Sequence, residues 1–299
     1  MSSSVCVILV NFKNEQKTVD CLRALEKSSV QPSCVCVVDN ASTEKSKQLF
    51  LNQAFGFQVR WIWNQENKGF AAGCNQGIRA LREEFANSYI WLLNNDTLPE
   101  ADALQKLLEK AETTKAGVTG SQIKKANGDF SGGVCFIHPK LATVRRPSSP
   151  SDTGFDYVEG SSFLISPDCL EKTGLLSEEY FLYFEESDYC WKAKRKGFTL
   201  AWATDSVIWH DIGSSTGSEI AKGAVPYFID CLMIRNRIHF ALKNGFQTTS
   251  VLIGFIISLL LRLKRLQVSR IITIIAITLS KKRFKKFIER NGGYYEIQD

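Results

Sequence analysis

The chain has 299 residues, which fits one large domain or one domain with an appendage, and its composition is that of an ordinary globular protein. The charge is uneven: residues 230–299 hold 13 Lys and Arg against 4 Asp and Glu, a net of +9, while the whole chain carries +6, so residues 1–229 carry −3. A nucleic-acid-binding protein needs its basic face on the folded body, so this class is excluded. The basic tail instead favours an anionic membrane surface as its partner.

Four short apolar runs in the first half of the chain predict buried strands at 5–10, 34–38, 59–63 and 89–93. Apolar residues at helical spacing predict helices at about 14–28, 70–85 and 100–113. Strands that alternate with helices predict an α/β protein with a largely parallel sheet. After about residue 124 the pattern becomes irregular, with short β-like pieces separated by glycines.

The tail has two apolar runs, at 251–261 and 271–279, with basic residues between and after them. Each run is shorter than the ~20 residues that span a bilayer. Basic helices of this kind can lie in a membrane interface. A helical hairpin packed on the body or on a second subunit explains the same pattern, and a homodimer therefore stays open.

The nine cysteines are scattered and contain no Cys-x-x-Cys pair. Their odd number and the absence of zinc-ligand spacing predict reduced, mostly buried thiols in a cytoplasmic protein. No signal peptide is predicted, because the apolar run at 5–10 is short and lacks a basic leader.

Polar residues stand where the predicted strands end. Asn94, Asn95 and Asp96 follow the run at 89–93, and Asp39 with Asn40 follows an earlier strand. Ligands of open α/β sheets bind beyond the carboxyl ends of the strands. Asp96 can hold a hard cation that holds phosphate, and Asp39 can bond a ribose hydroxyl or a base N–H. A turn or helix-cap role explains both segments as well.

Gly69, Gly73 and Gly77 recur every four residues in the predicted helix at 70–85. On a helix they form one bare stripe that a backbone or a ligand can approach. Lys68, at the start of this helix, can face a phosphate. The fingerprints of NAD and ATP sites are both missing, and tight helix–sheet packing is the competing explanation.

Three carboxylates, Glu185, Glu186 and Asp188, follow an aromatic stretch. A carboxylate at such an apolar border has a raised pKa and can serve as a general base. Acids at the start of a helix also complement its dipole, which explains their order without any function. His210 ends another predicted strand and becomes a metal-ligand candidate only if it lies beside Asp96.

In this order, these pieces resemble the family 2 glycosyltransferases with the GT-A fold, and within them the bacterial rhamnosyltransferase-type enzymes of surface polysaccharide synthesis. The matching stretches, within residues 5–240, are Val10-Asn11-Phe12, Asp39-Asn40-Ala41-Ser42, Asn67-Lys68-Gly69-Phe70, Leu93-Asn94-Asn95-Asp96-Thr97, Glu159-Gly160, Phe184-Glu185-Glu186-Ser187-Asp188, Trp209-His210 and Arg235-Asn236-Arg237.

The resemblance implies a GT-A-like fold, with a Rossmann-like, mostly parallel mixed sheet flanked by helices and a C-terminal helical appendage. Residues 1–240 would form the glycosyltransferase domain, with a nucleotide-sugar-binding half at 1–123 and an acceptor and catalytic half at 124–240. Residues 241–299 would form the basic amphipathic tail.

The resemblance also implies an inverting transfer of a sugar, rhamnose being one candidate, from a nucleoside-diphosphate sugar to a glycan or lipid-linked acceptor. Glu186 takes the position of the base, with Glu185 and Asp188 beside it. Asp96 and His210 would bind Mg²⁺ or Mn²⁺. The implied donor-binding residues are Val10, Asn11, Asp39, Asn40, Asn67, Lys68, Gly69, Asn75, Asn94 and Asn95.

Two residues depart from the family pattern. Asn94 replaces the first Asp of the Asp-x-Asp metal motif, which removes one charge from the site. Glu186 replaces an Asp, so the base is one methylene longer. Asn94 invites a second hypothesis, a non-catalytic nucleotide-sugar-binding or scaffold subunit of a membrane-associated assembly. Either protein is expected to be cytoplasmic and peripheral at the inner face of the cell membrane.

Overall fold

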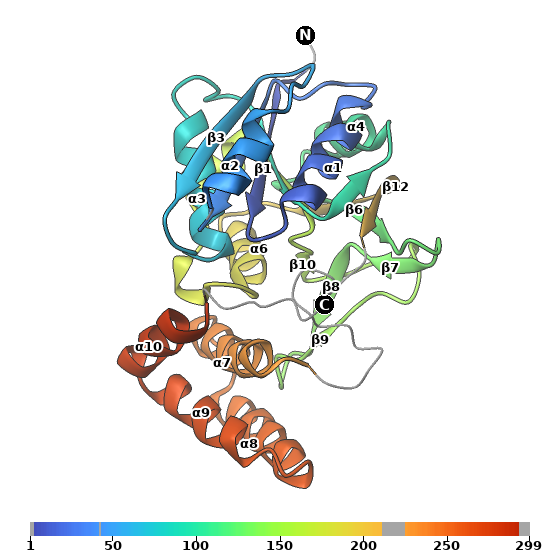
Figure 1. Cartoon of the computed structure of the whole chain (residues 1–299). Helices are drawn as coiled ribbons and strands as arrows, with labels where there is room; N and C mark the ends of the chain where they lie inside the picture. The colour runs from blue at the N-terminus through green and yellow to red at the C-terminus, as the bar shows by residue number, and fades with distance from the viewer. Residues whose placement is uncertain (1–2, 42, 211–224, 293–299) are drawn as a thin grey trace.

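The computed structural model describes residues 3–41, 43–210 and 225–292. Ser42, part of one stretch noted above, lies outside them. In the described part of the chain one sheet contains nine strands, and Figure 1 shows helices on both of its faces. Its hydrogen-bonded order is β3 (Val59–Asn64), β2 (Cys34–Asn40), β1 (Val5–Asn11), β4 (Tyr89–Asn94), β11 (Ser162–Ile165), β6 (Val118–Lys124), β12 (Leu200–His210) and β5 (Thr97–Pro99), with β7 (Phe130–Gly132) paired to β6.

Three further strands make a small antiparallel sheet, in the order β10 (Tyr157–Val158), β8 (Val134–Ile137) and β9 (Val144–Arg145). The helices are α1 (Glu15–Glu26), α2 (Glu44–Leu51), α3 (Phe70–Leu81), α4 (Ala103–Thr114), α5 (Pro167–Thr173), α6 (Glu185–Arg195), α7 (Tyr227–Lys243), α8 (Thr248–Lys264), α9 (Val268–Leu279) and α10 (Lys281–Asn291), and a 3₁₀ turn, η1, covers Glu178–Tyr180.

The central strands are buried on both faces, and their side chains alternate between two cores. In β1, Cys6 and Ile8 join the core beneath α3 and α6, whereas Val7 and Leu9 join the core beneath α1 and α4. This period-2 alternation explains why the strand has the continuous apolar run of a parallel sheet. Strands β3, β2, β1 and β4 are parallel, while β11 enters antiparallel between β4 and β6. The mixed α/β fold is confirmed, and so are the nine unpaired, buried cysteines.

The glycine stripe on α3 serves helix–sheet packing. A methyl group on Gly73 would lie 2.9 Å from the Val10 side chain, and one on Gly77 would lie 2.7 Å from Ile8. The bare face of α3 therefore rests directly on β1, which is the competing explanation given above. Gly69 differs, because its φ of +88° places it in the left-handed region beside the backbone of Phe181.

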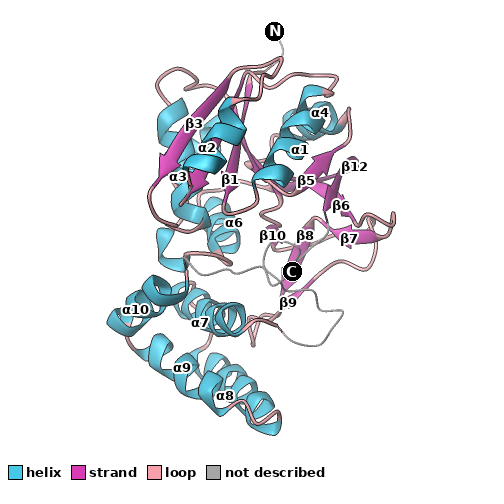
Figure 2. Cartoon of the chain, viewed as in Figure 1, coloured by secondary structure: helices cyan, strands magenta, loops and turns pink. Residues whose placement is uncertain are grey.

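Helices α7 to α10 form an all-helical group apart from the sheet, as Figure 2 shows. Their shared core contains Phe228, Leu232, Ile274 and Ile277. Asp230 of α7 pairs with both Arg262 and Arg270, which ties α8 and α9 to α7. The predicted boundary at residue 240 falls inside α7, and the domain division stays a prediction.

None of the described helices has both the length and the apolar character needed to cross a membrane.

We expect Gly77→Ala to destabilise the protein by about 1–3 kcal/mol, because the added methyl group meets the branched side chain of buried Ile8. Gly56→Ala is the matched control, since its methyl group would lie 3.6 Å from the nearest heavy atom, an ordinary contact. Urea unfolding followed by circular dichroism measures both. Equal unfolding midpoints for the two variants would contradict the close packing of α3 on β1.

Candidate active site

The carboxyl ends of the parallel strands bring distant polar residues to one edge of the sheet. Asn11 is in register with Asp39, and Asn40 with Asn64. The register also pairs Val10 with Asn94 at the end of β4. Chain positions more than 80 residues apart thus meet at the edge where open α/β sheets bind ligands.

A buried network of hydrogen bonds surrounds Asp39. Asn11 donates from Nδ2 to Asp39 Oδ1 at 2.8 Å, and its own Oδ1 accepts from Thr18 (2.8 Å) and Asn95 (3.0 Å). Asp39 Oδ2 is buried without a hydrogen-bond partner. Burial raises the pKa of Asp39 to about 6, partly opposed by the hydrogen bond from Asn11. The network therefore orients one carboxylate with a free acceptor oxygen.

A second set of amides joins this edge to the turn before α3. Asn64 donates from Nδ2 to Asn40 Oδ1 at 2.8 Å, and Asn40 donates to the carbonyl of Gly69 at 3.2 Å. Asn67 accepts from the amide of Gly69 at 2.9 Å and donates to the carbonyl of Gly292 at 2.7 Å. The turn is fixed from both sides, and Lys68 at its tip is exposed.

Asn75 lies deeper, and its carboxamide is fully used within the protein. The oxygen accepts from the Leu176 amide at 3.0 Å, and the nitrogen donates to the Leu176 carbonyl and to Glu178. The side chain holds the segment before η1 in place. It has no unpaired group to offer a ligand, so we leave it out of the donor site proposed below.

Asp96 and His210 lie side by side because β5 pairs antiparallel with the end of β12, where His210 is in register with Thr97. His210 Nε2 is 3.2 Å from Asp96 Oδ1, and the two side chains are 8% and 3% exposed. Around an octahedral cation with bonds of about 2.1 Å, neighbouring ligand atoms lie about 3 Å apart, so this spacing fits a shared metal ion.

In the described part of the chain no group of three or more His, Cys, Asp or Glu side chains could hold a metal. Among the described residues, Asp96 and His210 are therefore the pair that could contribute metal ligands at this edge, short of a full set. Asn94 contributes its backbone carbonyl to Thr97 Oγ1 at 2.7 Å, which shapes the turn that carries Asp96.

The acids at the start of α6 lie close to this edge. Glu186 packs against Gly160, and the next carbonyl, of Ser161, accepts from the amide of Asn94 at 3.1 Å. Burial, followed by the charge of Glu159, raises the pKa of Glu186 to about 7. Its Oε2 is buried without a hydrogen-bond partner. A half-buried carboxylate with this pKa is ionised in a large fraction of molecules at neutral pH, as a general base requires.

Glu185 is more deeply buried than Glu186, at 3% exposure. Burial, and then the charge of Glu186, raises the pKa of Glu185 well above its usual range. Ionisation is therefore costlier at Glu185 than at its neighbour Glu186.

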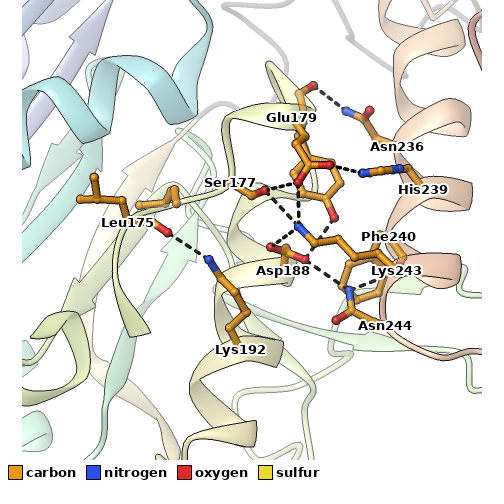
Figure 3. A network of polar contacts seen from close by, with 12 residues as sticks. Leu175, Ser177, Glu179, Asp188, Lys192, Asn236, His239, Phe240, Lys243 and Asn244 are labelled. Atoms are coloured by element: carbon orange, nitrogen blue, oxygen red, sulfur yellow. Dashed lines mark hydrogen bonds and ion pairs between the residues drawn. The ribbon is translucent and has the colours of Figure 1, made fainter. Parts of the chain in front are cut away.

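Asp188 belongs to a different network, which Figure 3 shows between α6, η1 and α7. Its carboxylate is fully buried and accepts from Tyr180 (3.2 Å), Lys243 (3.2 Å) and Asn244 (3.3 Å). Two residues along a helix correspond to about 200°, so Asp188 points away from Glu186. These contacts fasten α7 to α6, so we leave Asp188 out of the catalytic group proposed below.

Some residues of this region were not singled out in the sequence. Thr18 and Asn64 complete the amide networks, and Arg146 donates from Nε to Glu159 at 2.6 Å beside the base. Glu159 stood in a matching stretch without a role. Thr18 carries no local signal, because only the packing of α1 against the sheet edge brings it to Asn11.

Residues 5–160 match the model of a known family, described as glycosyl transferase family 2. The chain belongs to glycosyl transferase family 2. Among curated relatives of the family, the low-salt glycan biosynthesis hexosyltransferase Agl10 of Haloferax volcanii is 24% identical over 206 residues, which cover 67% of this chain and 64% of Agl10. The dTDP-rhamnosyl transferase RfbF of Shigella flexneri is 22% identical over 72% of each chain.

Among solved structures, GalNAc-T7 with UDP, GalNAc and Mn²⁺ aligns with a TM-score of 0.60 at 12% identity, over 80% of this chain and 48% of that one. At this identity the likeness shows the GT-A fold alone. The chain thus spans just under two thirds of Agl10 and about half of GalNAc-T7.

Proposed function

We propose that this family 2 protein is an inverting glycosyltransferase of glycan biosynthesis that uses a nucleoside-diphosphate sugar. The observation that carries the proposal is the position of Glu186, a half-buried carboxylate with an unpaired oxygen, next to the strand edge that holds Asp39 and Asp96. The contacts from Gly160 through Ser161 to Asn94 connect the two groups. Direct displacement places the base and the leaving diphosphate on opposite faces of the sugar. A base and a donor site that come from separate segments suit this arrangement.

In the proposed donor site, the free oxygen of Asp39 accepts a hydrogen bond from the nucleoside, at a ribose hydroxyl or a base N–H. Val10, Asn11, Asn40 and Asn95 form the floor that orients it, and the turn carrying Asn67, Lys68 and Gly69 lies nearer the diphosphate. Asp96 and His210 would hold Mg²⁺ or Mn²⁺, which stabilises the charge that develops on the leaving diphosphate.

In the proposed reaction, Glu186 takes the proton of an acceptor hydroxyl while the hydroxyl oxygen bonds to the anomeric carbon. The bond from that carbon to the diphosphate oxygen breaks on the opposite face, and the electron pair leaves with the nucleoside diphosphate. The base must be ionised for this step, so the pKa of about 7 suits it to neutral pH.

The similarity to RfbF makes dTDP-rhamnose the first donor to test. We further propose a glycan or lipid-linked acceptor in surface polysaccharide synthesis. Because Asn94 replaces the first Asp of the metal motif, we also consider a second function, a subunit that binds nucleotide sugars without turning them over. Binding of nucleoside diphosphates without turnover of any donor, across a broad acceptor panel, would favour that second function.

We also propose that the tail binds an anionic membrane at the cytoplasmic face. Apolar side chains three or four residues apart form an exposed stripe along α8, with the opposite side of the helix packed on α7. The large apolar side chains exposed on α8 and α9 are Leu252, Ile253, Ile256, Ile257, Leu260, Leu261, Leu263, Val268, Ile272 and Leu279. Lys264, Arg265 and the basic α10 adjoin this stripe, which is the composition of an interfacial helix pair.

We expect Glu186→Gln to lower kcat by about 10²- to 10⁴-fold while the affinity for the donor stays unchanged, because only the proton acceptor is lost. Asp188→Asn is the control: it should lower stability but keep kcat within about tenfold. In the wild type, turnover should rise as the pH passes through about 7, since Glu186 must lose its proton. Release of dTDP from dTDP-rhamnose, within a panel of donors, measures these rates. Near-normal turnover of Glu186→Gln would show that another group is the base.

We expect Asp96→Ala and His210→Ala each to weaken the binding of Mn²⁺ together with a nucleoside diphosphate by at least about tenfold. The reason is that each variant removes one of the two side chains proposed to bind the metal. Titration calorimetry with UDP, GDP and dTDP, with and without Mn²⁺, measures this coupling. His138→Ala, at an exposed histidine on the small sheet side, is the control. Unchanged Mn²⁺-dependent affinity in both site variants would place the metal elsewhere.

For the tail, we expect the full chain to float with phosphatidylglycerol vesicles and not with phosphatidylcholine vesicles. The double variant Ile256→Glu, Leu260→Glu should reduce the bound fraction at least about tenfold, because it places two charges in the apolar stripe. Leu51→Glu is the control, since Leu51 is equally exposed but lies on α2. Equal flotation of the two variants would favour a protein partner for the stripe.

A further inference from the structure

The segment that leads into the proposed base is an unusual turn. Phe181, Tyr183 and Phe184 all have positive φ angles, of 66°, 68° and 78°. Non-glycine residues rarely adopt this conformation, and they keep it only where surrounding contacts impose it. Phe184 is also the residue that precedes α6, and Glu185 and Glu186 follow at once. The path of this turn therefore sets the direction in which the base leaves the helix.

One side chain from another element holds the turn. Asn236 of α7 is fully buried, and its Nδ2 donates to the carbonyls of Tyr180 (2.8 Å), Leu182 (2.9 Å) and Tyr183 (3.0 Å). The two N–H donors of this amide are shared among the three carbonyls, so at least one hydrogen bond is bifurcated, and the contacts serve backbone groups that no helix or strand pairs. Hydrophobic packing alone would leave these carbonyls buried and unpaired.

Arg235 orients this amide. Its Nη1 donates to Asn236 Oδ1 at 2.9 Å and to the carbonyl of Glu179 at 3.0 Å. Its guanidinium also lies 3.7 Å from the centre of the Phe284 ring in α10. The hydrogen bond from Arg235 to Asn236 Oδ1 thus turns the nitrogen of the carboxamide toward the turn. Arg235 also holds the chain at Glu179, just before the turn.

The far side of the turn contacts the proposed donor site. The carbonyl of Phe181 accepts from the amide of Phe70 at 2.8 Å, and Gly69 lies so close that a methyl group there would sit 2.4 Å from the same oxygen. Displacement of the turn would therefore move the base and also disturb the start of α3.

From these contacts we propose that Asn236 is a positioning residue, which sets the location of Glu186 by holding the 181–184 turn in its left-handed conformation. The proposal rests on the proposed function only in calling Glu186 the base. The position that Asn236 gives to Glu186 does not depend on what Glu186 does. Asn236 itself contacts no substrate.

The pH at which the Glu186 carboxyl group titrates depends on its surroundings, so it reports the position of this side chain without any turnover. The groups that face its carboxylate are Glu159, Glu185, Tyr157 and Cys190, and its raised pKa depends on burial among them. If the turn relaxes, the carboxylate gains solvent and its pKa falls toward that of an ordinary glutamate.

The experiment is a ¹³C NMR titration of the full chain labelled at the Glu side-chain carboxyl, with Glu186→Gln to assign the resonance. We expect a midpoint near 7 in the wild type, and in Asn236→Ala a midpoint lower by about one pH unit or more. Asn244→Ala is the matched control: Asn244 directly follows α7 and also donates to α6, but to Asp188 rather than to the turn. It should leave the midpoint in place.

An unchanged midpoint in Asn236→Ala, or an equal shift in Asn244→Ala, would overturn the proposal. Asn236→Ser keeps one donor and should give an intermediate midpoint, which tests the same claim if the alanine variant does not fold. Where a donor is turned over, kcat of Asn236→Ala should fall about 10²-fold. A wild type with the raised midpoint but no turnover would instead refute the proposed function and leave the positioning role standing.

Discussion

Parallel strand register is the constraint on which the rest of this structure depends. Because β2, β1 and β4 run in the same direction, Asp39, Asn11 and Asn94 reach the same edge of the sheet. At this edge the side chains of Asn11, Asp39 and Asn95 form a chain of hydrogen bonds through the two amides. The amide network fixes their orientation at the cost of leaving Asp39 Oδ2 without a partner. A buried acceptor without a hydrogen bond lowers the stability of the folded protein by a modest free energy. A ligand that donates a hydrogen bond to Asp39 Oδ2 would remove that cost.

The carboxylates of this region show how burial and pairing separate roles. Asp188 is completely buried and has three donors, so its charge is satisfied and stabilises the junction of α6 and α7. Glu186 is less buried and one of its oxygens, Oε2, has no hydrogen-bond partner. Burial raises its pKa to about 7, although backbone hydrogen bonds partly oppose the shift. The two lie two positions apart on one helix. Proximity in sequence therefore says little about function, and the partners on neighbouring elements decide it.

Local pattern was enough to predict the parallel strands β1 to β4 and the helices α1, α3 and α4, because apolar periodicity depends on neighbouring residues alone. It also singled out Asp39, Asp96 and Glu186 as candidates, since each stands where a buried segment ends. The pattern could not separate a catalytic Asp188 from a structural one, because its partners Lys243 and Asn244 lie some 55 residues further along the chain. The full use of Asn75 by the segment at 176–178 escaped prediction for the same reason.

Gly69 illustrates how one residue can satisfy two constraints that are invisible in the sequence. As a member of the glycine stripe it looked like Gly73 and Gly77, which pack on β1. Its positive φ and its contact with the carbonyl of Phe181 give it a separate reason to lack a side chain. The same carbonyl belongs to the turn that Asn236 holds and that carries Glu186. A side chain at residue 69 would thus push against the segment that leads into the proposed base, so the proposed donor turn and the 181–184 turn constrain each other at this close contact.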